Sequence, residues 1–218
     1  MKTRLVHTGI SLLLIMLCGA VNDSAFAGPV AVENALPAAA CNSRLLHRQS
    51  VGVLLSEATM ANIEYLNHYR EFAEHNNAMA QLEPPVRQAF VASAQPLLAV
   101  QGVATVLKRQ FASVTLYDNL DALIAARPDV VVYIDARSRL ISRQNSAVSV
   151  DIQAQFFTAD FAYLGQARGV AGKDLASVWN LSTSVEQVAQ EVGSQQAVQV
   201  DALKRFDDSV GALVGAHS

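Results

Sequence analysis

The chain is poor in charged and aromatic residues and has only two cysteines. Of its 218 residues, 16% are charged and 6% are aromatic. Its 16 basic and 19 acidic side chains lack the positive excess with which proteins hold nucleic-acid phosphates. A hydrophobic content of 51% is too high for a disordered chain. The length and composition indicate a folded domain with one good core.

Sequence motifs of known catalytic sites are also missing. The chain has no Gly-x-Ser-x-Gly elbow, no His-Glu-x-x-His helix and no pair of closely spaced cysteines. A stripe of four potential ligands, Glu64, His68, Glu71 and His75, has residue types that bind zinc. The same spacing is typical of a solvated helix surface. We therefore expect no enzyme active site, no metal and no cofactor.

The first residues have the three-part pattern of a secretory signal peptide. Lys2 and Arg4 precede an apolar run at 10–21, and Ala25-Phe26-Ala27 follows. The run is shorter than the roughly 20 residues that span a bilayer. We expect cleavage after residue 27, export to the periplasm and no stable membrane span in the mature chain. Outer-membrane association stays open. Cys41 would then be the one cysteine left, and it could form no internal disulfide.

After the signal peptide, residues 28–49 predict a flexible lead-in and residues 50–218 a single domain. Apolar runs with β-branched residues predict strands at 50–56, 114–117, 129–141, 147–157 and 161–170. Helical spacing predicts helices at 58–80, 86–110 with a break at Pro96, 119–126, and from about 181 to 213 as one helix or a pair.

In the first of these helices, one face gathers large apolar side chains: Tyr65, Leu66, Tyr69, Phe72 and Ala73. The last helix has capping-box spacing at Thr183 and Glu186. The order of elements predicts an α/β (α+β) fold. We expect a single mixed sheet ending in an antiparallel three-strand meander, with helices packed on one face and a long C-terminal helix.

Alternating apolar and polar residues fix the expected register of the first hairpin in the meander. A two-residue turn at Gln144-Asn145 would set Arg137 against the core residue Ile152. A three-residue loop at 143–145 pairs Val132 with Phe156 and Arg137 with Asp151, so that apolar meets apolar. The second register is therefore predicted.

For the next hairpin, a turn at Ala159-Asp160 pairs Asp151 with Arg168. Asp151 would then lie between Arg137 and Arg168 on adjacent strands. The polar side of the meander is either a solvated surface or a binding face for an anion or a partner protein. As such a face we nominate Tyr133, Arg137, Asp151, Gln153, Gln155 and Arg168.

The stretch from Val51 to about Lys173 resembles an α/β domain of bacterial envelope proteins, among them the curli-secretion channel CsgG, the amino-terminal domain of TolB and the exopolysaccharide-export lipoprotein PelC. The resemblance lies in the order of an apolar first strand, a helix with Leu-x-x-x-Phe, a Val-rich strand, an Asp-Val-Val-Val strand and an aromatic-Asp turn. In this chain these are Val51-Gly-Val-Leu-Leu55, Leu107-Lys-Arg-Gln-Phe111, 114–118, Asp129-Val-Val-Val132 and Phe157-Thr-Ala-Asp160. The resemblance implies binding and assembly in place of catalysis.

The sequence thus predicts an exported, non-catalytic accessory protein of the bacterial envelope that acts through protein–protein contacts in secretion or assembly. Its expected partners are other envelope proteins or further copies of itself, and no nucleic acid. Two alternatives remain open. One is a periplasmic small-ligand or anion-binding protein, which predicts a concave pocket lined by the arginines. The other is a hydrolase with an unrecognised site, which predicts a perturbed titratable cluster in a cleft.

Overall fold

The computed structural model describes residues 45–142, 144–175 and 184–215. The predicted signal peptide, both cysteines, Thr183 and the predicted lead-in up to residue 44 lie outside these residues. The end of the lead-in belongs to the fold: Leu45 is buried, and the Leu46 N–H donates to the Gln49 side chain at 2.7 Å. The ordered domain therefore begins before residue 50.

Five strands form one mixed sheet in the order β2-β1-β3-β4-β5. β1, β2 and β3 are parallel, whereas β3, β4 and β5 form the antiparallel meander. Along the chain the elements are β1 (Ser50–Leu55), α1 (Glu57–His75), α2 (Asn77–Ala80), α3 (Pro84–Ser93), α4 (Leu98–Gln110), β2 (Ser113–Leu116), α5 (Leu120–Ala126), β3 (Val130–Arg139), β4 (Ala147–Thr158), β5 (Tyr163–Asp174) and α6 (Val185–Gly215).

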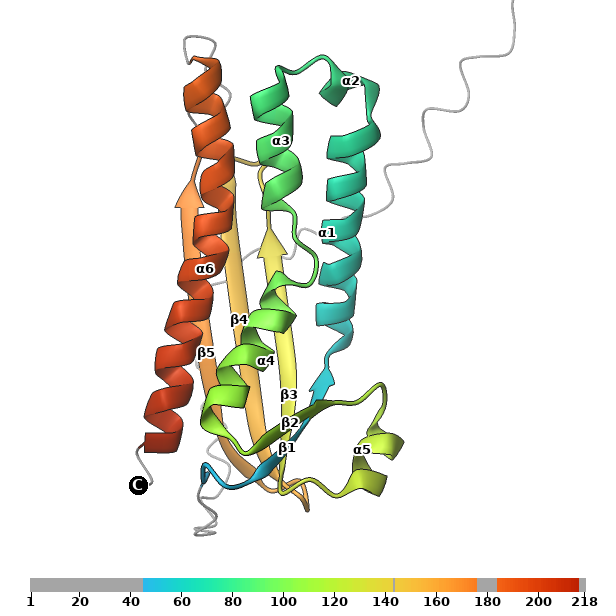
Figure 1. The fold of residues 1–218 in the computed structure, drawn as a ribbon, viewed down its shortest axis with the longest axis vertical. Helices are drawn as coiled ribbons and strands as arrows, with labels where there is room; N and C mark the ends of the chain where they lie inside the picture. The colour runs from blue at the N-terminus through green and yellow to red at the C-terminus, as the bar shows by residue number, and fades with distance from the viewer. Residues whose placement is uncertain (1–44, 143, 176–183, 216–218) are drawn as a thin grey trace, which may run out of the picture. The chain divides into compact units, whose positions relative to one another are not determined.

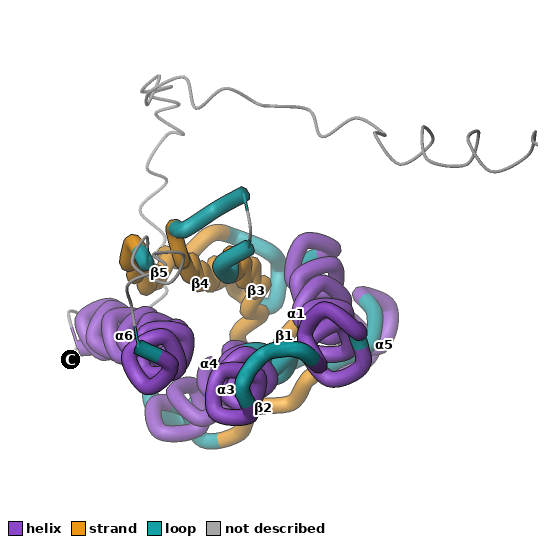
Figure 2. The backbone as a smooth tube through the Cα atoms, turned by 90° about the horizontal axis from the view of Figure 1, so that it is seen from above, coloured by secondary structure: helices purple, strands orange, loops and turns teal. Residues whose placement is uncertain are grey.

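The predicted fold class is confirmed. Helices α1, α3, α4 and α6 lie on one side of the meander, and α6 runs along β5 and β4 (Figures 1 and 2). The break between α3 and α4 contains Pro96, as expected. α6 is one continuous helix through Gly193. The capping residue of α6 is Ser184, one residue after the predicted Thr183. Ser184 Oγ accepts from the Gln187 N–H at 3.3 Å, and Gln187 Oε1 accepts from the Ser184 N–H at 3.2 Å.

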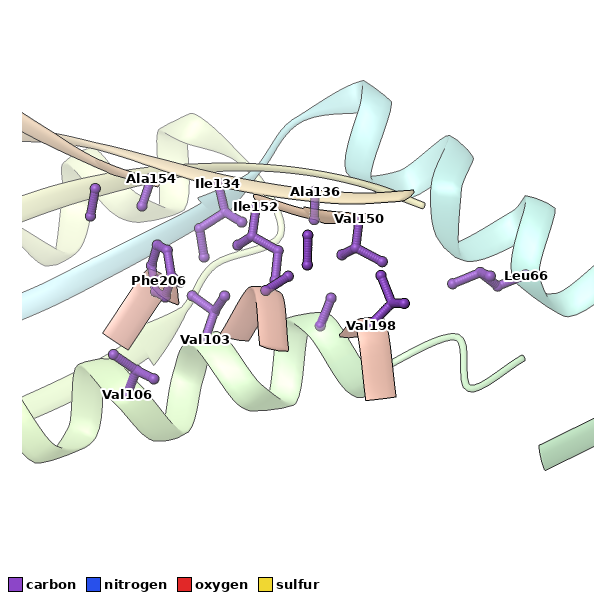
Figure 3. Packing of buried hydrophobic residues seen from close by; sticks show 14 of the residues in the cluster. Leu66, Val103, Val106, Ile134, Ala136, Val150, Ile152, Ala154, Val198 and Phe206 are labelled. Carbon is purple, nitrogen blue, oxygen red and sulfur yellow. The ribbon is translucent and has the colours of Figure 1, made fainter. Parts of the chain in front are cut away.

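The core fills the space between the meander and the helices (Figure 3). Ile134, Ile152 and Ala154 point from the strands toward Phe206 of α6 and Val103 of α4, all of them buried. Each long strand has apolar residues at alternate positions, so one face of the sheet supplies this core. The opposite face of β3, β4 and β5 is consequently the polar one.

α6 approaches β5 closely enough to cap its outer edge. A Cβ on Gly169 would lie 2.0 Å from the Ala202 carbonyl oxygen, so only glycine fits there. The Arg168 N–H donates to Ser209 Oγ at 3.1 Å, and Arg205 donates to the Val170 carbonyl at 2.9 Å. Edge backbone groups that are satisfied in this way are poor templates for a further strand.

β1 ends at Leu55, and beyond that point side chains of α1 supply hydrogen-bond partners to the backbone of β3. From there, four α1 side chains hydrogen-bond successive backbone groups along β3 and the residues that follow it. The contacts are Thr59 Oγ1 with Ile134 O at 3.0 Å and Ala136 N at 2.8 Å, Asn62 Oδ1 with Ser138 N at 2.7 Å, Tyr65 Oη with Leu140 N at 3.1 Å and Tyr69 Oη with Ile141 O at 3.1 Å. These side chains take the place of a neighbouring strand.

The apolar face predicted for this helix is only partly buried. Leu66 and Ala73 are in the core, whereas Phe72 is 53% exposed. Tyr69 is largely buried, and its burial raises the pKa of the phenol above its usual value. Among the described residues no single helix is long and apolar enough to cross a membrane; the bent pair α3 and α4 meets that test by length and composition only.

Candidate binding face

The outward face of β3, β4 and β5 displays all six nominated residues together. Opposed residues in neighbouring strands share a face. Tyr133 pairs with Gln155, and Arg137 pairs with Asp151, as predicted. Val132 also pairs with Phe156, which confirms the predicted register of the first hairpin. The predicted loop at 143–145 is wrong, because Ser142 and Asn145 exchange backbone hydrogen bonds of 2.8 and 3.2 Å and close the turn one residue earlier.

The register predicted for the second hairpin is wrong by two residues. Arg168 pairs with Gln153, and Asp151 pairs with Val170. The Thr158 N–H donates to the Ala162 carbonyl at 2.8 Å, so the hairpin loop is one residue longer than the predicted turn, and an irregularity between Phe156 and Phe157 shifts the register by the second residue. A shift of two residues keeps the side chains from Gly165 onward on the predicted face. Tyr163, predicted opposite the core residue Phe156, lies opposite Phe157 on the outward face, because the register changes between Phe156 and Phe157.

Each arginine of this face is held by one aspartate. Arg168 donates to Asp151 from Nε at 2.9 Å and from Nη2 at 2.5 Å. Arg137 donates to Asp135, on its own strand, at 3.0 and 2.9 Å. The predicted ladder with Asp151 between two arginines is therefore wrong in one of its two bonds. The hydrogen bonds that both guanidinium groups donate to these carboxylates raise their pKa above its ordinary value.

We expect a double-mutant cycle on Arg168 and Asp151 to give a coupling of about 0.2–1 kcal/mol in the free energy of unfolding, since the pair is bidentate but half exposed. The matched cycle on Arg137 and Asp151 is expected to give less, because these residues face each other without a hydrogen bond. Urea unfolding of the alanine variants measures both. A larger coupling for Arg137 than for Arg168 would contradict the observed pairing.

Amide and aromatic side chains fill the rest of the face. Gln153 Nε2 donates to Gln166 Oε1 at 3.1 Å across β4 and β5. Tyr133 is 40% exposed beside Gln155. Where β4 ends and β5 begins, the rings of Phe157 and Tyr163 meet edge to face, with centroids 5.8 Å apart.

Four residues of this surface were not nominated from the sequence: Asp135, Gln166, Phe157 and Tyr163. Asp135 lies two residues before Arg137 on the same face, so the alternation that marked Arg137 also marks it. The same alternation marks Phe157 on β4 and Gln166 on β5, whereas the place of Tyr163 depends on the irregularity between Phe156 and Phe157.

One short helix lies against the outward side of the sheet. A Cβ on Gly52 would come within 3.1 Å of Leu123 of α5, and Gly52 pairs with Val131, whose side chain is buried outside the main core. α5 therefore covers β1 on this side, and no other helix of the described ranges lies over the outward side of β3, β4 and β5. Its Leu120 and Ile124 are about half exposed.

Three depressions formed by described residues lie on the helical side of the sheet. A depression of about 560 Å³ is found where α1 meets the break between α3 and α4, lined by Ile63 and Leu97 among others. Arg137 and Arg168 line neither this depression nor two others that involve α1. The stripe predicted as Glu64, His68, Glu71 and His75 lies exposed on α1, and the described part of the chain holds no group of three His, Cys, Asp or Glu side chains that could bind a metal ion.

The fold and this face define an α/β protein whose helices cover one side of the sheet and whose meander is open on the other. No protein-family model matches the chain, and no curated protein matches it. Among solved structures it is similar to the PelC dodecamer from Paraburkholderia phytofirmans, with a TM-score of 0.34, 11% identity and coverage of 73% of this chain and 92% of that one. A variant of that protein gives a TM-score of 0.33.

The hypothetical protein CT253 from Chlamydia trachomatis is also similar, with a TM-score of 0.38, 12% identity and coverage of 77% of this chain and 99% of that one. These similarities are of layout. PelC is thus among the similar structures, as the sequence resemblance predicted. The resemblance to CsgG and TolB stays a prediction.

Proposed function

We propose that this chain is an exported, non-catalytic accessory protein of the bacterial envelope that works in secretion or assembly through protein–protein contacts. Its contact surface would be the outward face of β3, β4 and β5. The export step is inferred from the N-terminal sequence alone. The observation that carries the contact function is the face itself: three long strands that no other helix or strand of the described residues covers, bearing exposed tyrosines and arginines and partly exposed glutamines.

The composition of the face suits a protein partner better than a small anion. Tyrosine and arginine are enriched at protein interfaces, and a flat surface offers a partner a large area. Asp151 and Asp135 already engage the two nominated arginines, which offsets the positive charge that an anion would need. The arginines also stand outside the three depressions described above.

Site-specific photocross-linking in cells that produce the full chain tests this function. We expect a photoreactive residue in place of Gln155, at the centre of the face, to give discrete adducts of higher mass. The same residue in place of Glu64, exposed on α1 in the helical layer, is the matched control and is expected to give few. Adducts of equal yield at both positions, or at Glu64 alone, would show that the contact surface lies elsewhere.

A further inference from the structure

One row of the outward face is self-complementary in charge from β3 to β5. This row is Asp135, Gln153 and Arg168: negative, neutral and positive, with Asp135 also accepting from Arg137 and Arg168 also donating to Asp151 of the same chain. The next row is Tyr133, Gln155 and Gln166, and a third is the apolar set Val131, Phe157 and Tyr163. When a second copy of the charged row is turned end for end and laid over the first, the positive end of each copy lies against the negative end of the other.

A two-fold axis that lies between two such faces and runs parallel to β4 performs this reversal. It places β3 of one copy over β5 of the other at the same height along the strands. Asp135 then faces the partner's Arg168, and Gln153 faces the partner's Gln153. Gln153 uses its Nε2 on Gln166, which leaves its Oε1 as a free acceptor toward the partner.

From this arrangement we propose that the partner of the face is a second copy of the chain, docked face to face about a two-fold axis parallel to β4. The proposal rests on the proposed function, in which this face is the contact surface. A closed two-fold contact requires a self-complementary patch. Asp151 would face the partner's Asp151, and each is neutralised by the Arg168 of its own chain.

The same axis also brings the second copy against Tyr163, the exposed residue of the apolar row, where β5 begins. α5 lies over Gly52, which is in the row of Val131, Phe157 and Tyr163. After the rotation, the α5 of one copy lies beside the Tyr163 of the other. Tyr163 is 57% exposed, so this contact would bury apolar surface on both copies.

The available area is of the order that a dimer needs. Ten residues of β3 at about 3.3 Å each, across three strands about 4.8 Å apart, give a flat area of roughly 500 Å² before side-chain relief is counted. Standard interfaces bury about 800 Å² on each partner. The side chains that project from the strands and the contact with α5 would have to supply the remaining buried area.

Charge reversal in two separate chains tests the proposal. Asp135→Arg makes both ends of the row positive, and Arg168→Glu makes both ends negative. Each variant alone is expected to lose the dimer, with a dissociation constant raised at least about tenfold by like-charge contacts. A 1:1 mixture restores opposite charges at every contact and is expected to form a heterodimer. Light scattering on the purified exported chain measures the mass of each sample.

Matched controls carry the same charge changes on the helical side: Glu64→Arg and Lys204→Asp are expected to leave the dimer intact. Gln155→Lys, at a partly exposed position that faces its own copy, is expected to disrupt the dimer without breaking an intrachain ion pair. Circular dichroism checks that all variants are folded. A monomeric wild-type chain, a dimer that survives the reversals, or a mixture that stays monomeric would overturn the proposal. If Gln155 then still cross-links to other envelope proteins, the proposed function stands and only the choice of partner is wrong.

Discussion

Replacing Gly169 by valine is expected to destabilise the fold by about 3 kcal/mol or more, because the added side chain collides with backbone atoms. A Cβ at this position would lie 2.0 Å from Ala202 O and 2.5 Å from Phe206 N. No change of rotamer removes a backbone clash, so α6 would have to move away from β5. Urea unfolding followed by circular dichroism measures the loss.

The matched control is Gly193→Ala in α6, where an added Cβ meets nothing within 4 Å. Alanine is a better helix former than glycine, so this variant is expected to gain about 0.5–1 kcal/mol. If Gly169→Val unfolds at the same urea concentration as the wild-type chain, the close packing of α6 on β5 is wrong.

Thr59→Val is expected to cost about 1–3 kcal/mol although valine has nearly the same shape. Thr59 is fully buried and its hydroxyl accepts from the Ala136 N–H at 2.8 Å. Valine would leave that N–H buried without an acceptor, and an unsatisfied buried donor loses the free energy of its hydration. Thermal or urea unfolding measures the change.

Thr105→Val is the control, since the Thr105 hydroxyl donates to Gln101 O on the exposed surface of α4. Water can replace that bond, so the expected change in stability stays within about 0.5 kcal/mol. Equal losses in the two variants would mean that the α1 side chains do not complete the edge of β3.

The sequence could predict the sheet and the face of each nominated residue, because alternation in β3 and β4 is regular over ten paired positions. It could not predict the second register. Registers that differ by two residues present the same faces, and the choice depends on the hairpin loop. In that loop Phe161 has a φ of 61°, a left-handed conformation that bulky residues seldom adopt. No sequence pattern for an ordinary two-residue turn predicts it.

The polar edge of α1 could not be predicted either, for a different reason. Thr59 and Asn62 are unremarkable in a helical pattern. They are buried because β1 ends at Leu55 and leaves the backbone of β3 without a strand partner. That requirement arises between segments more than 70 residues apart in the sequence. Likewise Arg137 bonds Asp135 on its own strand instead of the opposed Asp151, a choice between two carboxylates within reach of one long side chain.

The most direct test of the central claim, that the outward face of β3, β4 and β5 is a contact surface, is hydroxyl-radical footprinting of the unmodified chain. Its natural reporters are Tyr133 and Tyr163 on the face and Met60 and Phe72 on α1, all at least 40% exposed. We predict that both tyrosines are protected in a cell-envelope extract relative to the dilute purified chain, whereas Met60 and Phe72 react equally in both. Unchanged reactivity of the tyrosines, or protection confined to α1, would contradict the account.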